Sequence, residues 1–167
     1  MRFTLIVLLT LNLTAFSQNK KIDEINRYIT SIDSNSDLKI NEYDWSKVTG
    51  THIDKGAILK IWKKDNEIVK IKEEFGASYG RCIRLIYLKN SKPIKAIETE
   101  ENFEFKNNEI DYTSLKLQFK IQVFVTGFNK VIDEYEFDVI KEGKRKLTEY
   151  YCDLNEVFSI RDEISNL

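Results

Sequence analysis

Oxygen-bearing side chains recur through DSNSDLKINEYD, residues 33–44, at the spacing of a calcium-binding loop. An EF-hand loop surrounds Ca²⁺ with oxygens from alternate positions and from its last residue. Here these positions are Asp33, Asn35, Asp37, the backbone carbonyl of Lys39, Asn41 and Asp44. Leu38 replaces the usual turn glycine, and Asp44 is one methylene shorter than the usual glutamate. The stretch therefore predicts either a weak site for calcium, the one candidate cofactor, or an ordinary polar loop after a helix.

A second group of carboxylates lies in ETEENFEFKNNE, residues 98–109. Two carboxylates can cleave a glycosidic bond, but glutamates two apart on a strand normally form its solvated side or pair with cross-strand lysines. The single histidine, His52, has no metal-ligand motif around it, and no G-x-S-x-G sequence is present. The sequence favours a non-catalytic protein, with a small carboxylate-dependent hydrolase as an alternative.

The amino-terminal residues 1–17 read as a secretory signal peptide, with Arg2, an apolar run and small residues before a cleavage site. The apolar run is shorter than the roughly 20 residues that span a bilayer. We therefore expect residues 18–167 to be a single domain that is exported, either periplasmic or secreted. In an oxidising compartment Cys82 and Cys152 are expected to form a disulfide, two buried thiols being the alternative.

The charge balance and the aromatic residues indicate which kinds of partner the protein can bind. Lys and Arg number 26 against 27 Asp and Glu, for a net charge of −1. This balance gives no electrostatic footprint for nucleic acid. The chain is rich in aromatic residues, and some of them are expected to form an exposed surface for a protein or an envelope component. The candidates are Trp45, Trp62, Tyr87 and Phe128.

The elements that must position these residues begin with an amphipathic helix over residues 20–32, where apolar residues recur every three or four positions. After residue 50 the period becomes two. Residues 56–74 and 80–101 predict hairpins that turn at Asp65–Asn66 and Asn90–Ser91. Residues 102–113 are expected to be a loop or an irregular edge strand.

Residues 116–126 and 131–140 predict two long strands. A three-residue loop, 127–129, would pair Val125 with Val131 and Phe119 with Phe137. A strand over residues 144–152 and a helix capped by Asp153 complete the chain. The predicted fold class is α+β: an N-terminal amphipathic helix, an antiparallel meander of about six or seven strands, and a C-terminal helix on one face of the sheet.

These patterns lead to one main functional hypothesis, an exported non-catalytic binding protein of inhibitor-like or toxin-neutralising type. A calcium-dependent module using residues 33–44 and a small secreted hydrolase are the alternatives.

Overall fold

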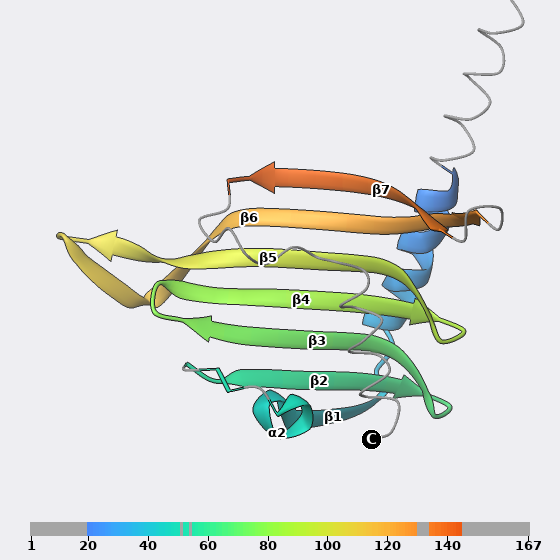
Figure 1. Cartoon of the computed structure of the whole chain (residues 1–167), viewed down its shortest axis with the longest axis horizontal. Coiled ribbons are helices and arrows are strands. Elements are labelled where there is room, and N and C mark those ends of the chain that lie inside the picture. The colour runs from blue at the N-terminus through green and yellow to red at the C-terminus, as the bar shows by residue number, and fades with distance from the viewer. Residues whose placement is uncertain (1–19, 51, 54, 130–133, 145–167) are drawn as a thin grey trace, which may run out of the picture.

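The computed structural model describes residues 20–50, 52–53, 55–129 and 134–144. In these residues seven strands form one antiparallel sheet, and each strand pairs with the next one along the chain (Figure 1). The strands are β1 (Lys39–Asp44), β2 (Ala57–Lys64), β3 (Glu67–Ala77), β4 (Gly80–Lys89), β5 (Lys92–Lys106), β6 (Glu109–Asn129) and β7 (Glu134–Gly143). The prediction of an antiparallel meander with α+β content is confirmed. Among the described residues, no helix combines the length and the apolar character needed to cross a membrane.

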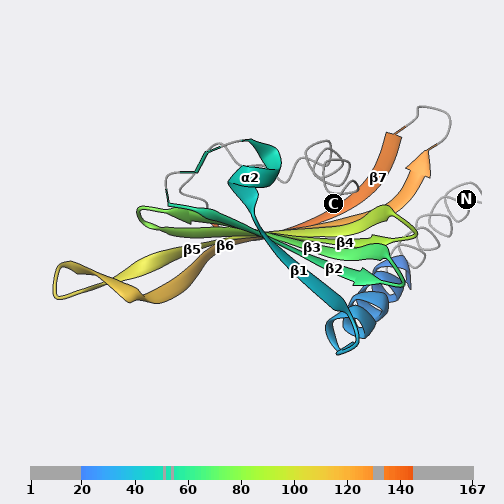
Figure 2. The same cartoon turned by 90° about the horizontal axis from the view of Figure 1, so that it is seen from below.

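Two helices lie on opposite faces of this sheet (Figure 2). Residues 20–33 form the N-terminal helix, and the face that it covers is called here the helix face. The short helix α2 (Trp45–Thr49) lies over the other face, the α2 face. Asp44 begins α2 by accepting a hydrogen bond from the Ser46 amide at 3.0 Å, and Gly50 ends it with a left-handed φ of 72°.

Tight turns of one kind connect three of the strand pairs. Both central residues have a positive φ in the turns at Asp65–Asn66, Asn90–Ser91 and Asn107–Asn108. Such turns match the right-handed twist of the strands that they join, and Asn and Asp tolerate this conformation better than most residues. The first two turns confirm the predicted hairpins. The third lies in the stretch predicted as a loop or irregular edge, and it instead joins β5 to β6.

Each face of the sheet carries its own apolar cluster. The N-terminal helix buries Ile25, Ile29 and Ile32 on the helix face, where they pack with side chains from the following segment and three strands, Leu38, Val69, Tyr87 and Phe124. The cluster on the α2 face consists of Leu59, Ile61, Ile71, Ile86, Leu88 and Ala96. Because both faces of the sheet are covered, a middle strand such as β4 carries apolar residues at successive positions as well as at alternate ones.

The predicted register of the last hairpin is wrong. Strand β6 continues through Asn129, so that Val125 lies opposite Phe137 and Phe119 lies opposite Gly143. The predicted and observed pairings differ by an even number of residues, which leaves every side chain on its original face. Alternation alone therefore could not choose between them. The predicted signal peptide, Cys152 and the C-terminal helix lie outside the described residues.

Candidate functional site

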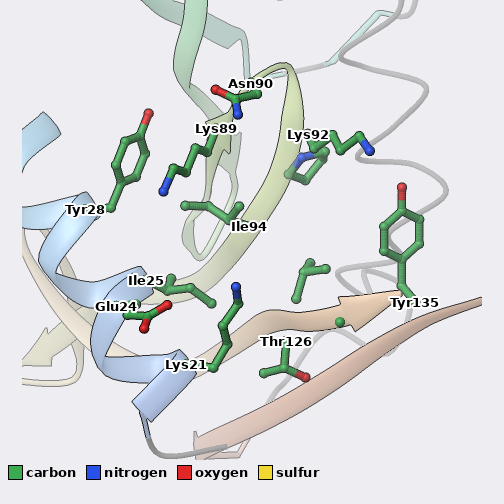
Figure 3. A pocket seen from close by; sticks show the side chains of 13 residues that line it. Lys21, Glu24, Ile25, Tyr28, Lys89, Asn90, Lys92, Ile94, Thr126 and Tyr135 are labelled. Carbon is green, nitrogen blue, oxygen red and sulfur yellow. The ribbon is translucent and has the colours of Figure 1, made fainter. Parts of the chain in front are cut away.

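A groove of about 530 Å³ lies between the first turns of the N-terminal helix and the sheet (Figure 3). We call it the helix–sheet groove. Its walls come from the helix, from the β4–β5 turn and from the ends of β6 and β7. The described lining residues are Lys21, Glu24, Ile25, Tyr28, Lys89, Asn90, Lys92, Pro93, Ile94, Val125, Thr126, Gly127 and Tyr135.

The groove combines an apolar interior with a charged rim. Ile25 and Ile94 face it from the helix and from β5 (Figure 3), and Val125 adds a third aliphatic side chain. The rim carries Lys21 and two lysines that flank the β4–β5 turn, Lys89 and Lys92, with Glu24 as the acidic member of the described lining. A mostly apolar pocket with a few polar groups is typical of small-molecule sites.

The helical wall of the groove is fixed to β4 through Tyr28. Its hydroxyl donates a hydrogen bond to the Leu88 carbonyl at 3.2 Å, and the Lys89 ammonium lies 5.2 Å from the centre of the Tyr28 ring. Burial, followed by the nearby Glu67 carboxylate, raises the pKa of Tyr28. The ring therefore stays neutral and apolar at physiological pH, and it holds the Lys89 cation beside the groove.

The C-terminal end of the helix is fixed by a charged contact. The Asp33 carboxylate accepts hydrogen bonds from Lys70 Nζ at 2.6 Å and from the Tyr87 hydroxyl at 2.9 Å. Burial and then the hydrogen bond to Asp33 raise the pKa of Tyr87 well above its ordinary value. Lys70 also lies 4.9 Å from the centre of the Trp62 ring. These contacts attach the C-terminal end of the helix to the middle of the sheet.

A buried lysine also holds the helix, at Asn26, two residues before Tyr28. Lys95 is 6% exposed, donates a hydrogen bond to the Asn26 side chain at 3.1 Å, and has its ammonium 4.2 Å from the centre of the Phe124 ring. Burial, with a further contribution from Lys120, lowers the pKa of Lys95.

The α2 face contains a buried network of charges. Arg84 donates to Glu73 at 3.2 Å and to Glu98 at 3.4 Å, and the three side chains are 2%, 0% and 3% exposed. They are cross-strand neighbours on β4, β3 and β5. The Trp45 indole of α2 donates a hydrogen bond to the other oxygen of Glu73 at 2.6 Å. Glu100, on the same strand as Glu98, is 1% exposed.

This network corrects the expectation of a solvated strand side for Glu98 and Glu100, whereas Glu104 and Glu109 are exposed as expected. Glu98 and Glu100 are 3% and 1% exposed, and Glu98 lies beside the buried Arg84. Their sequence pattern is that of an exposed strand, and the compensating Arg84 is distant in sequence. The cavity beside Arg84 and Glu98 measures only about 10 Å³, far below the volume of an organic ligand site. The network acts here as a structural ion cluster.

Residues 33–44 do not adopt a calcium-loop conformation. Residues 39–44 form β1 and pair with β2, which places Lys39, Asn41 and Asp44 along an extended strand. Asn35 accepts a hydrogen bond from the Asp37 amide at 2.9 Å, whereas Asp33 binds Lys70 and Tyr87, and Asp44 caps α2. Among the described residues, no group of three or more His, Cys, Asp or Glu side chains is placed to hold a metal ion. Calcium binding by this stretch stays a prediction, and the described residues do not form a calcium site in this conformation.

The structure separates the four aromatic residues predicted to share a partner surface. Tyr87 is 3% exposed and belongs to the core, so its predicted exposure is wrong. Trp62 is half-buried on the helix face, and Trp45 is half-buried on the α2 face. Phe128 lies on β6, and the structure does not describe its side chain. Cys82 is 7% exposed on β4, and the predicted disulfide stays a prediction because Cys152 is not described.

Exposed aromatic side chains instead lie on the β5–β6 hairpin. This hairpin extends beyond the other strands (Figures 1 and 2). Phe105 is 71% exposed and Tyr112 is 67% exposed. The NFEFKNNEIDYT stretch carries these residues in the sequence, but its polar insertion obscured the alternation that marks a strand.

A second, more open groove of about 780 Å³ lies near β1 and contains His52 and three acidic residues. Those acidic residues already have partners. Glu42 lies 2.6 Å from Lys60, Glu74 lies 2.6 Å from Lys72 and 3.0 Å from Arg81, and Asp44 caps α2. The acidic charges of this groove are therefore used within the fold.

The helix–sheet groove is thus the strongest candidate site for a ligand among the described residues. Comparison with known proteins adds no family assignment, since no family model, no curated protein and no solved structure matches the chain.

Proposed function

We propose that this protein is a non-catalytic binding protein that holds a small, largely apolar molecule in the helix–sheet groove. The observation that carries the proposal is the groove itself: about 530 Å³, with an apolar interior and a few polar groups at its rim. Its volume falls within the range of about 300–1,000 Å³ found for ligand pockets. Tyr28 and Asp33 attach the middle and the C-terminal end of the helix to the sheet, which fixes the helical wall of the groove.

We further propose that the protein works after export, in a periplasm or outside the cell, as residues 1–17 predict. In that setting the ligand would be an apolar component of the cell envelope or of its surroundings. The carboxylates of the α2 face support a binding role over a catalytic one, because Glu73 and Glu98 are both directed at Arg84.

The test is a fluorescence titration with N-phenylnaphthylamine, an uncharged dye that emits strongly in apolar sites. We expect saturable binding of one dye per chain, and loss of that binding in Ile94→Trp, where the larger ring fills the groove. Ile58→Trp is the matched control because Ile58 is 40% exposed and lies outside the groove lining. Absence of saturable binding, or equal loss in both variants while both keep the wild-type melting temperature, would refute the proposed function.

A further inference from the structure

We infer that the ligand of the helix–sheet groove is a single-chain amphiphile with an anionic head group, either a carboxylate or a phosphate monoester. This inference rests on the proposed function, because it names the ligand class of the same groove.

The charge of the rim is the first argument. Lys21, Lys89 and Lys92 outnumber Glu24 in the described lining, although the whole chain has a net charge of −1. Within the part of the chain that the structure describes, none of these three lysines forms an ion pair. Elsewhere on the sheet, Lys60, Lys70 and Lys72 each lie 2.6 Å from a carboxylate. The groove therefore concentrates cations that do not form an ion pair with any carboxylate of the described residues.

The placement of the cations is the second argument. Lys21 extends from the helix, and Lys89 and Lys92 extend from the opposite wall at the β4–β5 turn (Figure 3). Ile25, Ile94 and Val125 provide apolar surface between these walls. An anionic head group can contact the lysines while an alkyl chain lies against the aliphatic side chains. The Tyr28 ring holds Lys89 by a cation–π contact that does not neutralise its charge.

The choice of lysine at the rim indicates which anionic head groups the groove can bind. A lysine ammonium is a compact charge with rotatable donors, so it accepts a carboxylate or a phosphate without a fixed planar geometry. An uncharged amphiphile would fill the same apolar surface and gain nothing from the rim. The predicted signature is a difference in affinity between anionic and neutral amphiphiles that share one alkyl chain.

The experiment is calorimetric titration of the protein with decanoate, decyl phosphate, decanol and decyltrimethylammonium, each below its micelle concentration. We expect both anions to bind about tenfold more tightly than decanol, and added salt to reduce this preference. The double variant Lys89→Gln, Lys92→Gln should lose most of the preference and keep the affinity for decanol. Lys106→Gln, Lys116→Gln is the matched control, because both lysines are exposed on the β5–β6 hairpin away from the groove.

The outcomes separate the two proposals. If decanol or the cationic amphiphile binds as tightly as the anions, or if the two double variants behave alike, the inference about the head group is wrong and the proposed function stands. If none of the four amphiphiles binds to the folded protein, both proposals fail. A tenfold anion preference that disappears only in the groove variant supports both.

Discussion

The Tyr87 hydroxyl donates a hydrogen bond to the Asp33 carboxylate over 2.9 Å, joining the end of the N-terminal helix to a strand 54 residues later in the chain. The same carboxylate lies 2.6 Å from Lys70 Nζ. Tyr87 is 3% exposed, so a buried side chain on β4 holds the carboxylate at the end of the helix. This contact orients the helix that forms one wall of the helix–sheet groove.

The first prediction concerns the alkaline stability of this contact. The pKa of Tyr87 is raised in the folded protein, so the unfolded chain loses its phenolic proton first as the pH increases. The stabilisation is fully present below pH ~10 and decreases above it, since the folded state then binds more protons than the unfolded state. Tyr28 contributes with the same sign. Urea unfolding should show a smaller alkaline loss of stability in Tyr87→Phe than in the wild type.

At neutral pH, Tyr87→Phe should lower the free energy of unfolding by about 1.5–3 kcal/mol, the usual worth of a hydrogen bond to a charged group. Tyr112→Phe is the control because Tyr112 is 67% exposed. An alkaline decline in Tyr87→Phe as steep as that of the wild type would contradict this account of Asp33 and Tyr87.

The second prediction concerns the buried network on the α2 face. Arg84→Met removes the buried cation that pairs with Glu73 and Glu98, which should lower the free energy of unfolding by about 3–5 kcal/mol. Chemical unfolding at neutral pH measures this loss.

A triple variant tests the origin of that loss. Glu73→Gln, Arg84→Met, Glu98→Gln should recover most of the stability, since the two carboxylates that Arg84 binds are replaced by neutral amides. Arg81→Met provides the matched control: Arg81 pairs with Glu74 and Glu101 at 3.0 Å and 2.6 Å, but its side chain is 37% exposed. We expect Arg81→Met to cost less than about 1 kcal/mol. Similar losses in Arg84→Met and Arg81→Met would show that burial of the ion pairs does not determine their contribution to the free energy of unfolding.

The third prediction concerns the β5–β6 turn. Asn108 has a φ of 65°, a conformation that costs a residue with a side chain more than it costs glycine. Asn108→Gly should therefore increase the free energy of unfolding by about 0.5 kcal/mol, and Asn108→Ala should decrease it by about 1 kcal/mol. Thermal unfolding compares the three proteins. The opposite order would mean that the hairpin turns in another conformation.

Local patterns in the sequence predicted much of the sheet. Asp65–Asn66 and Asn90–Ser91 predicted turns because their residues tolerate a left-handed backbone. The alternation in β6 predicted a strand with Phe119, Ile121 and Val123 on one buried face. The Asn107–Asn108 turn carried the same signal, but the polar residues around it favoured a loop.

The candidate site could not be predicted in the same way. Lys21, Lys89 and Val125 are far apart in the sequence, and none of them lies in a recognisable motif. Residues 33–44 are the reverse case, a recognisable motif without a site. They have the spacing of a calcium loop, but residues 39–44 form an edge strand. Spacing along the chain carries information about a site only when the backbone takes the conformation that the spacing assumes.

The sequence by itself therefore determined the strands β2 to β4, much of β5 to β7, the turns at Asp65–Asn66 and Asn90–Ser91, and the antiparallel meander. These properties depend on side-chain periodicity and on backbone preferences over a few residues. The tertiary structure decided the register of β7, the burial of Glu98 beside Arg84, and the position of three lysines around an apolar groove. Each of these depends on which distant side chains meet, and a periodic pattern that repeats every two residues is compatible with several such pairings.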